Sequence, residues 1–84
     1  MNKTININLA GIIFHLDEGA YESFKDYLIQ IKNALDHQEG GAEIIADIEA
    51  RIAELFSMRM QESKREAITI EDVNFIQTTL GDPQ

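Results

Sequence analysis

The residues in this chain whose types could do chemistry are few, and their spacing builds no catalytic site. His15 lies in a segment that alternates between apolar and polar residues. A histidine there could carry a proton or bind a metal, but acid–base catalysis also needs a partner held close by. The residues next to His15 in sequence supply none. We therefore interpret His15 as an exposed or hydrogen-bonded side chain, and we expect no catalytic residue.

A second group of polar residues surrounds a pair of glycines: Asp36, His37, Glu39 and Glu43. Structural zinc usually takes cysteine or histidine at set spacings, and a calcium loop has an alternating acidic pattern. Neither pattern occurs here, so a solvated loop is the better interpretation. We expect no metal and no cofactor, and a small metal-binding protein is kept only as an alternative.

Charge and composition limit the remaining classes of function. The 84 residues carry a net charge of −8, and the one basic cluster, Arg59, Lys64 and Arg65, is interleaved with Glu62 and Glu66. An acidic domain repels a phosphate backbone unless a basic patch overcomes the field. We expect no nucleic-acid binding by this domain alone.

Length, cysteine content and apolar runs indicate one small soluble domain over residues 1–84. The chain has no cysteine, which excludes a disulfide framework and fits a cytoplasmic setting. No apolar run approaches the roughly 20 residues that span a bilayer. The 44% hydrophobic content is that of a globular protein.

Residues 4–16 predict a β-hairpin. The run 4–9 alternates apolar and polar residues, Ala10-Gly11 supplies a turn, and the run 12–16 returns. A two-residue loop would pair Leu9 with Ile12, Ile7 with Phe14, and Ile5 with Leu16, all on the face to be buried. Alanine is poor at the positive φ of a type I′ turn, so a bulged turn is left open.

Three helices are predicted after the hairpin, over about 18–37, 42–60 and 70–80. Asp17 is a suitable N-cap for the first, and Gly40-Gly41 breaks the chain before the second. Thr69 and Asp72 have the spacing of a capping box for the third. The expected fold class is α+β in the order β-β-α-α-α, with the hairpin packed on the helices or completed by a partner.

The second predicted helix has the strongest apolar stripe, formed by Ile45, Ile48, Ile52, Leu55 and Phe56. This spacing is typical of a helix that packs, and its polar face predicts a weak ion pair between Asp47 and Arg51. Helical spacing also assigns five aromatic residues to the core: Tyr21, Phe24, Tyr27, Phe56 and Phe75. Candidate interaction residues are Met58 and Met60 near the end of this helix, together with Asn6, Asn8 and His15 on the hairpin.

Three segments of the chain resemble the soluble N-terminal part of Bacteroidetes proteins that carry a phage shock protein C domain. They are residues 2–18, 39–56 and 68–73, in the same order. The resemblance implies an envelope-stress role, a label of putative transcriptional regulator, and a following membrane domain that this sequence does not contain. The chain is then either an excised domain or a free-standing relative.

These observations predict a non-enzymatic protein-interaction or regulatory domain of a membrane-associated stress protein. It would dock a partner or a second copy, and would lie in the cytoplasm, on the cytoplasmic side of the inner membrane if part of a longer protein. A DNA-associated regulator is the first alternative.

Overall fold

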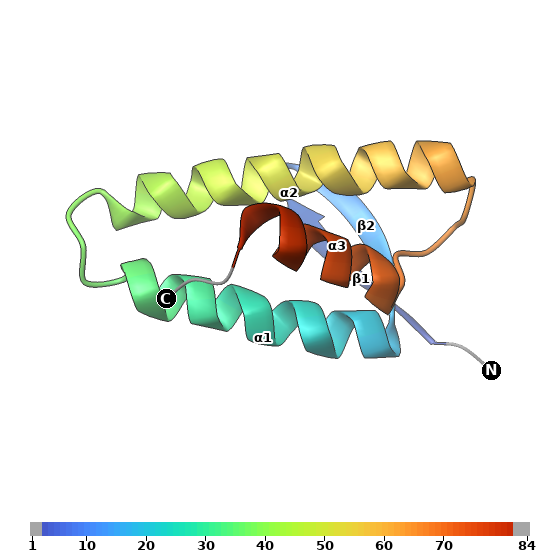
Figure 1. The fold of residues 1–84 in the computed structure, drawn as a ribbon, viewed down its shortest axis with the longest axis horizontal. Helices are drawn as coiled ribbons and strands as arrows, with labels where there is room; N and C mark the ends of the chain where they lie inside the picture. Colours follow the sequence, from blue (N-terminus) through green and yellow to red (C-terminus); the bar gives the residue numbers. More distant parts are fainter. Residues whose placement is uncertain (1–2, 82–84) are drawn as a thin grey trace.

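A computed structural model, which describes residues 3–81, has a hairpin followed by three helices (Figure 1). The predicted α+β class and element order are confirmed. The elements are β1 (Thr4–Leu9), β2 (Ile12–Asp17), α1 (Glu18–Leu35), α2 (Gly41–Ser63) and α3 (Ile70–Leu80).

The hairpin has the predicted register. Leu9 pairs with Ile12, and the alternation continues to Thr4 opposite Asp17. Ala10 and Gly11 have φ values of 52° and 84°, as a type I′ turn requires, so the bulged alternative is wrong. The Asn8 side chain accepts a hydrogen bond from the Gly11 backbone at 3.0 Å, which helps to hold alanine in this conformation.

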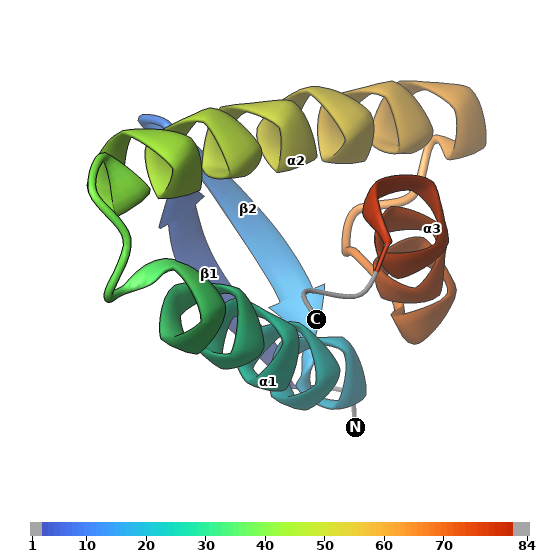
Figure 2. The same ribbon diagram turned by 60° about the vertical axis from the view of Figure 1, so that its left-hand side comes forward.

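The core lies between the hairpin and the three helices, with the hairpin and α3 on opposite sides of the space between α1 and α2 (Figure 2). Phe56 of α2 forms its centre. Its ring centroid lies 5.6 Å from that of Phe14 and 5.3 Å from that of Phe24. Each of these aromatic residues comes from a different element, so the three rings join β2, α1 and α2.

The helix ends differ from the predicted ones in two places. α1 ends at Leu35, two residues early. α2 runs to Ser63, because helix-forming polar residues continue it until Lys64 adopts a left-handed conformation with φ 56°. At its other end, Gly40 has φ 76°, which fits the expected glycine break.

The segment before α3 adds a short parallel contact to the sheet. Ile68 accepts a backbone hydrogen bond from Asp17 at 3.0 Å and donates one to the carbonyl of His15 at 2.7 Å. The predicted capping box of Thr69 and Asp72 is present. Ile68 and Val73 are fully buried, as a hydrophobic staple would have them.

Two apolar residues are more exposed than the sequence predicted. Ile12 is 46% exposed, because it lies beside the turn at the margin of the covered face. Phe75 is 39% exposed and packs under the guanidinium of Arg59, 4.5 Å from its ring centroid, instead of in the core. Among residues 3–81, no helix is both long and apolar enough to cross a membrane.

Candidate functional site

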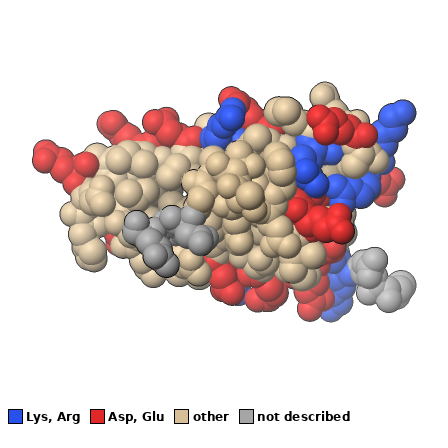
Figure 3. Space-filling view, in the orientation of Figure 1, with Lys and Arg blue, Asp and Glu red and all other residues tan. Residues whose placement is uncertain are grey.

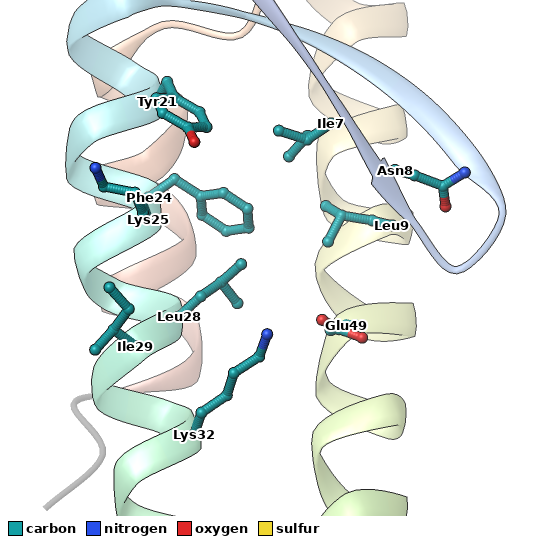
Figure 4. A pocket seen from close by; sticks show the side chains of 10 residues that line it. All are labelled: Ile7, Asn8, Leu9, Tyr21, Phe24, Lys25, Leu28, Ile29, Lys32 and Glu49. Atoms are coloured by element: carbon teal, nitrogen blue, oxygen red, sulfur yellow. The ribbon is translucent and has the colours of Figure 1, made fainter.

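A groove of about 290 Å³ lies between β1, α1 and α2 (Figure 4). Ile7 and Leu9 of β1 point into it toward Tyr21, Phe24 and Leu28 of α1, and Glu49 of α2 lies at its far side (Figure 4). The groove is lined by Ile7, Asn8, Leu9, Tyr21, Phe24, Lys25, Leu28, Ile29, Lys32 and Glu49. Its floor is largely apolar, and such concave apolar surfaces are the usual sites of recognition.

The strand beside this groove has an open outer edge. In a two-residue hairpin, Leu9 and Ile12 exchange backbone hydrogen bonds, and every second pair after them does the same. The backbone N–H and C=O groups of Thr4, Asn6 and Asn8 therefore point away from β2. Within the described range 3–81, these groups have no further backbone partner. β1 thus offers an unpaired edge of the kind that accepts an added strand.

Two lysines of α1 line the groove on either side of an exposed isoleucine. Lys25 lies 3.6 Å from Glu22 and 5.6 Å from the centroid of the Tyr21 ring. Lys32 extends toward the groove (Figure 4), and no carboxylate among residues 3–81 lies within ion-pair distance of it. Ile29, between them, is 47% exposed. Lys25 is therefore balanced by Glu22, and Lys32 is the lysine of this rim that has no ion-pair partner among residues 3–81.

The predicted interaction residues do not form one surface. Asn6 and His15 face each other across the hairpin, and their side chains make a hydrogen bond. With Asn8, they lie on the exposed face that points away from the helices. Met58 is 53% exposed on α2, whereas Met60 packs against the core. The hairpin residues and the methionines therefore lie on opposite sides of the sheet.

Lys and Arg side chains gather at the end of the molecule where α2 ends (Figure 3). Two arginines in this part of the chain, Arg59 and Arg65, bind the buried carboxylate of Asp72. Arg59 Nε lies 2.5 Å from Asp72 Oδ1, and Arg65 donates to the same oxygen at 2.8 Å. The other oxygen of Asp72 accepts the Thr69 backbone N–H at 2.9 Å. These contacts join the start of α3 to the end of α2. Both arginines are therefore already paired with a carboxylate of the same chain.

Asp72 is an ionised structural group. Burial raises its pKa, but the hydrogen bonds from Thr69, Arg59 and Arg65 outweigh that effect and lower the pKa below the usual aspartate value. A general acid or base works best with a pKa near the working pH. The shift moves Asp72 away from that range, so its environment favours a structural role over proton transfer.

The loop that superficially resembled a metal site lies between α1 and α2. Within residues 3–81, no three histidine, aspartate or glutamate side chains are grouped closely enough to hold a metal ion. On α2 the predicted ion pair of Asp47 with Arg51 is wrong. Arg51 instead contacts Glu54 at 3.2 Å, because an i,i+3 partner is equally within reach on a helix.

The sequence analysis did not predict the groove, although the spacing of some of the residues that line it can be read from the sequence. Lys25, Ile29 and Lys32 have a four-and-three spacing, which places them on one helix face. The three residues alone resemble an ordinary solvated surface. Only the approach of β1 and α2 to α1 forms a groove there.

The chain matches no protein-family model, no curated protein and no solved structure with significant similarity.

Proposed function

We propose that this protein is a non-enzymatic interaction domain whose contact surface is the open edge of β1 with the adjoining groove. The observation that carries the proposal is the unpaired backbone of Thr4, Asn6 and Asn8 next to an apolar floor. Addition of a strand to such an edge supplies main-chain hydrogen bonds, and neighbouring pockets select side chains.

The proposed biological setting follows the resemblance to proteins with a phage shock protein C domain. In that setting the domain regulates an envelope-stress protein from the cytoplasmic side of the inner membrane. A membrane segment outside this sequence would tether it. Its partner is a protein or a second copy of the domain.

The experiment that tests this proposal blocks the edge without unfolding the hairpin. The Asn6 N–H points away from β2, so Asn6→Pro removes an outward donor and leaves the hairpin hydrogen bonds in place. Asn6→Ala is the matched control, because it removes the same side chain and keeps the N–H. Circular dichroism first shows whether both variants are folded.

Size-exclusion chromatography with light scattering at micromolar concentration reports self-association. Affinity capture from cells, with the bound protein identified and its complex rebuilt from purified components, reports another partner. We expect the interaction with wild type and Asn6→Ala, and its loss in Asn6→Pro. A strict monomer that captures no partner would contradict the proposal, as would a complex that Asn6→Pro leaves intact.

The arginines argue against the alternative of a DNA-associated regulator. Arg59 and Arg65 already contact Asp72, and binding to phosphate would have to compete with that carboxylate. A salt-dependent mobility shift of duplex DNA by the purified domain would favour the DNA-associated regulator over the protein-interaction domain.

A further inference from the structure

We infer that the groove binds a small anionic amphiphile, a single unbranched hydrocarbon chain with a carboxylate at one end, as in a medium-chain fatty acid. The hydrocarbon chain would lie on the apolar part of the groove, and the carboxylate would meet Lys32 (Figure 4). The inference goes beyond the proposed function and does not depend on it, because the site uses side chains of the groove and not the backbone edge of β1.

The apolar part of the groove is formed by side chains of two elements that converge. Ile7 and Leu9 of β1 point toward Phe24 and Leu28 of α1 (Figure 4). Leu9 and Phe24 are buried and form the floor, whereas Ile7 and Leu28 are only partly buried and form the walls. A hydrocarbon chain here would remove apolar surface from water, which is favourable roughly in proportion to the area covered.

The dimensions of the groove favour a ligand with one chain. Its volume of about 290 Å³ lies at the lower end of the range for ligand pockets, and is too small for a lipid with two long chains. Phe24, Leu28 and Lys32 follow one another at intervals of four, so they share one face of α1. From the first to the last of them the helix rises about 12 Å, close to the length of an extended chain of about ten carbons.

The charges of the groove place the head group at Lys32. Its side chain extends into the groove (Figure 4), and within the described range 3–81 no carboxylate lies within ion-pair distance of it. Lys25 is paired with Glu22 and points away from β1. Glu49 is the one acidic residue among the described residues that line the groove. Because Glu49 repels anions, the site should prefer a head group with a single negative charge.

The test is a titration of the isotope-labelled protein with decanoate, followed by NMR. Decylammonium is the comparison ligand, because it has the same chain and the opposite charge. We expect saturable shifts along the groove with millimolar decanoate, and binding of decylammonium about fivefold weaker or more. From hexanoate to octanoate to decanoate, the affinity should rise by up to about fourfold per methylene.

Three variants locate the head group, each checked first by circular dichroism. Lys32→Gln should weaken decanoate about two- to fivefold, the range expected for loss of an exposed ion pair. Arg51→Gln removes the same charge from an exposed position on α2 and should leave the affinity unchanged. Glu49→Gln removes the repelling carboxylate, so it should strengthen the binding of decanoate.

Four outcomes would overturn the inference. They are no saturable shift with decanoate; decylammonium binding as tightly as decanoate; equal losses of affinity in Lys32→Gln and Arg51→Gln; and shifts along the groove with the strand-forming peptide Thr-Val-Thr-Val-Thr-Val-Thr while decanoate produces none. The last outcome would assign the groove to a peptide.

The variant Asn6→Pro separates this inference from the proposed function. Asn6 does not line the groove, so decanoate should bind Asn6→Pro as it binds wild type, whereas the partner complex should be lost. If decanoate failed to bind while Asn6→Pro still abolished the complex, the proposed function would stand alone. If decanoate bound as expected while the edge experiment failed, the amphiphile site would stand alone.

Discussion

The carboxylate of Asp72 lies 2.5 Å from Nε of Arg59, so the first turn of α3 is joined to the last turns of α2. The Asp72 side chain is fully buried, whereas the side chains of Arg59 and Arg65 are 28% and 34% exposed. The cations stay partly hydrated while the anion depends wholly on protein donors. This asymmetry makes the aspartate the member of the cluster whose loss should cost most.

Replacement of that carboxylate should destabilise the fold. Asp72→Ala removes the capping box and two charge-assisted hydrogen bonds, and we expect a loss of about 2–3 kcal/mol in the free energy of unfolding. Urea denaturation followed by circular dichroism measures it. Asp47→Ala, on the exposed face of α2, is the control and should stay within about 0.5 kcal/mol of wild type.

The same group should make stability depend on acid pH. The folded-state pKa of Asp72 is lowered, so its contribution is fully present above the unfolded pKa of about 3.9 and is lost as pH falls through the folded value. The difference in unfolding free energy between wild type and Asp72→Asn should therefore shrink as the pH falls below about 4. A constant difference down to pH 2 would mean that the Asp72 carboxylate contributes nothing through its charge.

The start of α2 should reject any side chain at Gly41. A Cβ built there would lie 2.1 Å from the carbonyl oxygen of Leu35, so Gly41→Ala must displace the backbone of the connecting loop. We expect a cost of about 1–3 kcal/mol, measured by thermal unfolding. At Gly19, in the first turn of α1, a Cβ would approach only the Asp17 side chain, at 3.8 Å. Gly19→Ala should therefore be neutral or stabilising, and equal effects at the two glycines would contradict this account.

A substitution in the hairpin turn should increase the stability of the fold. Ala10 holds φ 52°, a conformation that asparagine adopts more readily than alanine in the first position of a type I′ turn. Ala10→Asn should raise the free energy of unfolding by about 1 kcal/mol, whereas Ala10→Val should lower it, because a β-branched residue is strained at positive φ. Chemical denaturation of the two variants distinguishes them, and a stabilising valine would refute the turn assignment.

The centre of the core should be far more sensitive than the aromatic ring at the surface. Phe56 is fully buried against Phe14 and Phe24, and Phe56→Ala should cost about 3–5 kcal/mol. That is a large share of the roughly 4–12 kcal/mol expected for a domain of this length. Phe75→Ala removes a half-exposed ring under Arg59 and should cost about 1 kcal/mol. Thermal melts of both variants test the ranking.

Local patterns were enough to predict most of the fold. The alternation of residues 4–9 with 12–16 predicted the full hairpin register, because a one-residue slip would turn every apolar side chain to solvent. Thr69 and Asp72 predicted the start of α3, because a capping box involves only four consecutive residues and is visible in the sequence. The end of α2 was harder to predict from the sequence, because polar residues that form helices well continue the helix beyond its apolar pattern.

Features that depend on distant segments were not predictable in this way. Phe75 has helical spacing like the core residues, but the position of Arg59 on another helix keeps it at the surface. The roles of Arg59 and Arg65 depend on the approach of α3 to the end of α2. The groove likewise exists only because β1 lies along α1.

The parallel contact of Ile68 with β2 has a consequence for the stoichiometry of any complex made through the sheet. Head-to-tail polymers would require β1 of one copy to reach β2 of the next, and Ile68 already occupies the backbone of that strand at His15 and Asp17. Two copies that meet through β1 would instead form a closed pair. The domain is therefore built to terminate strand addition, and would be a poor seed for a fibre.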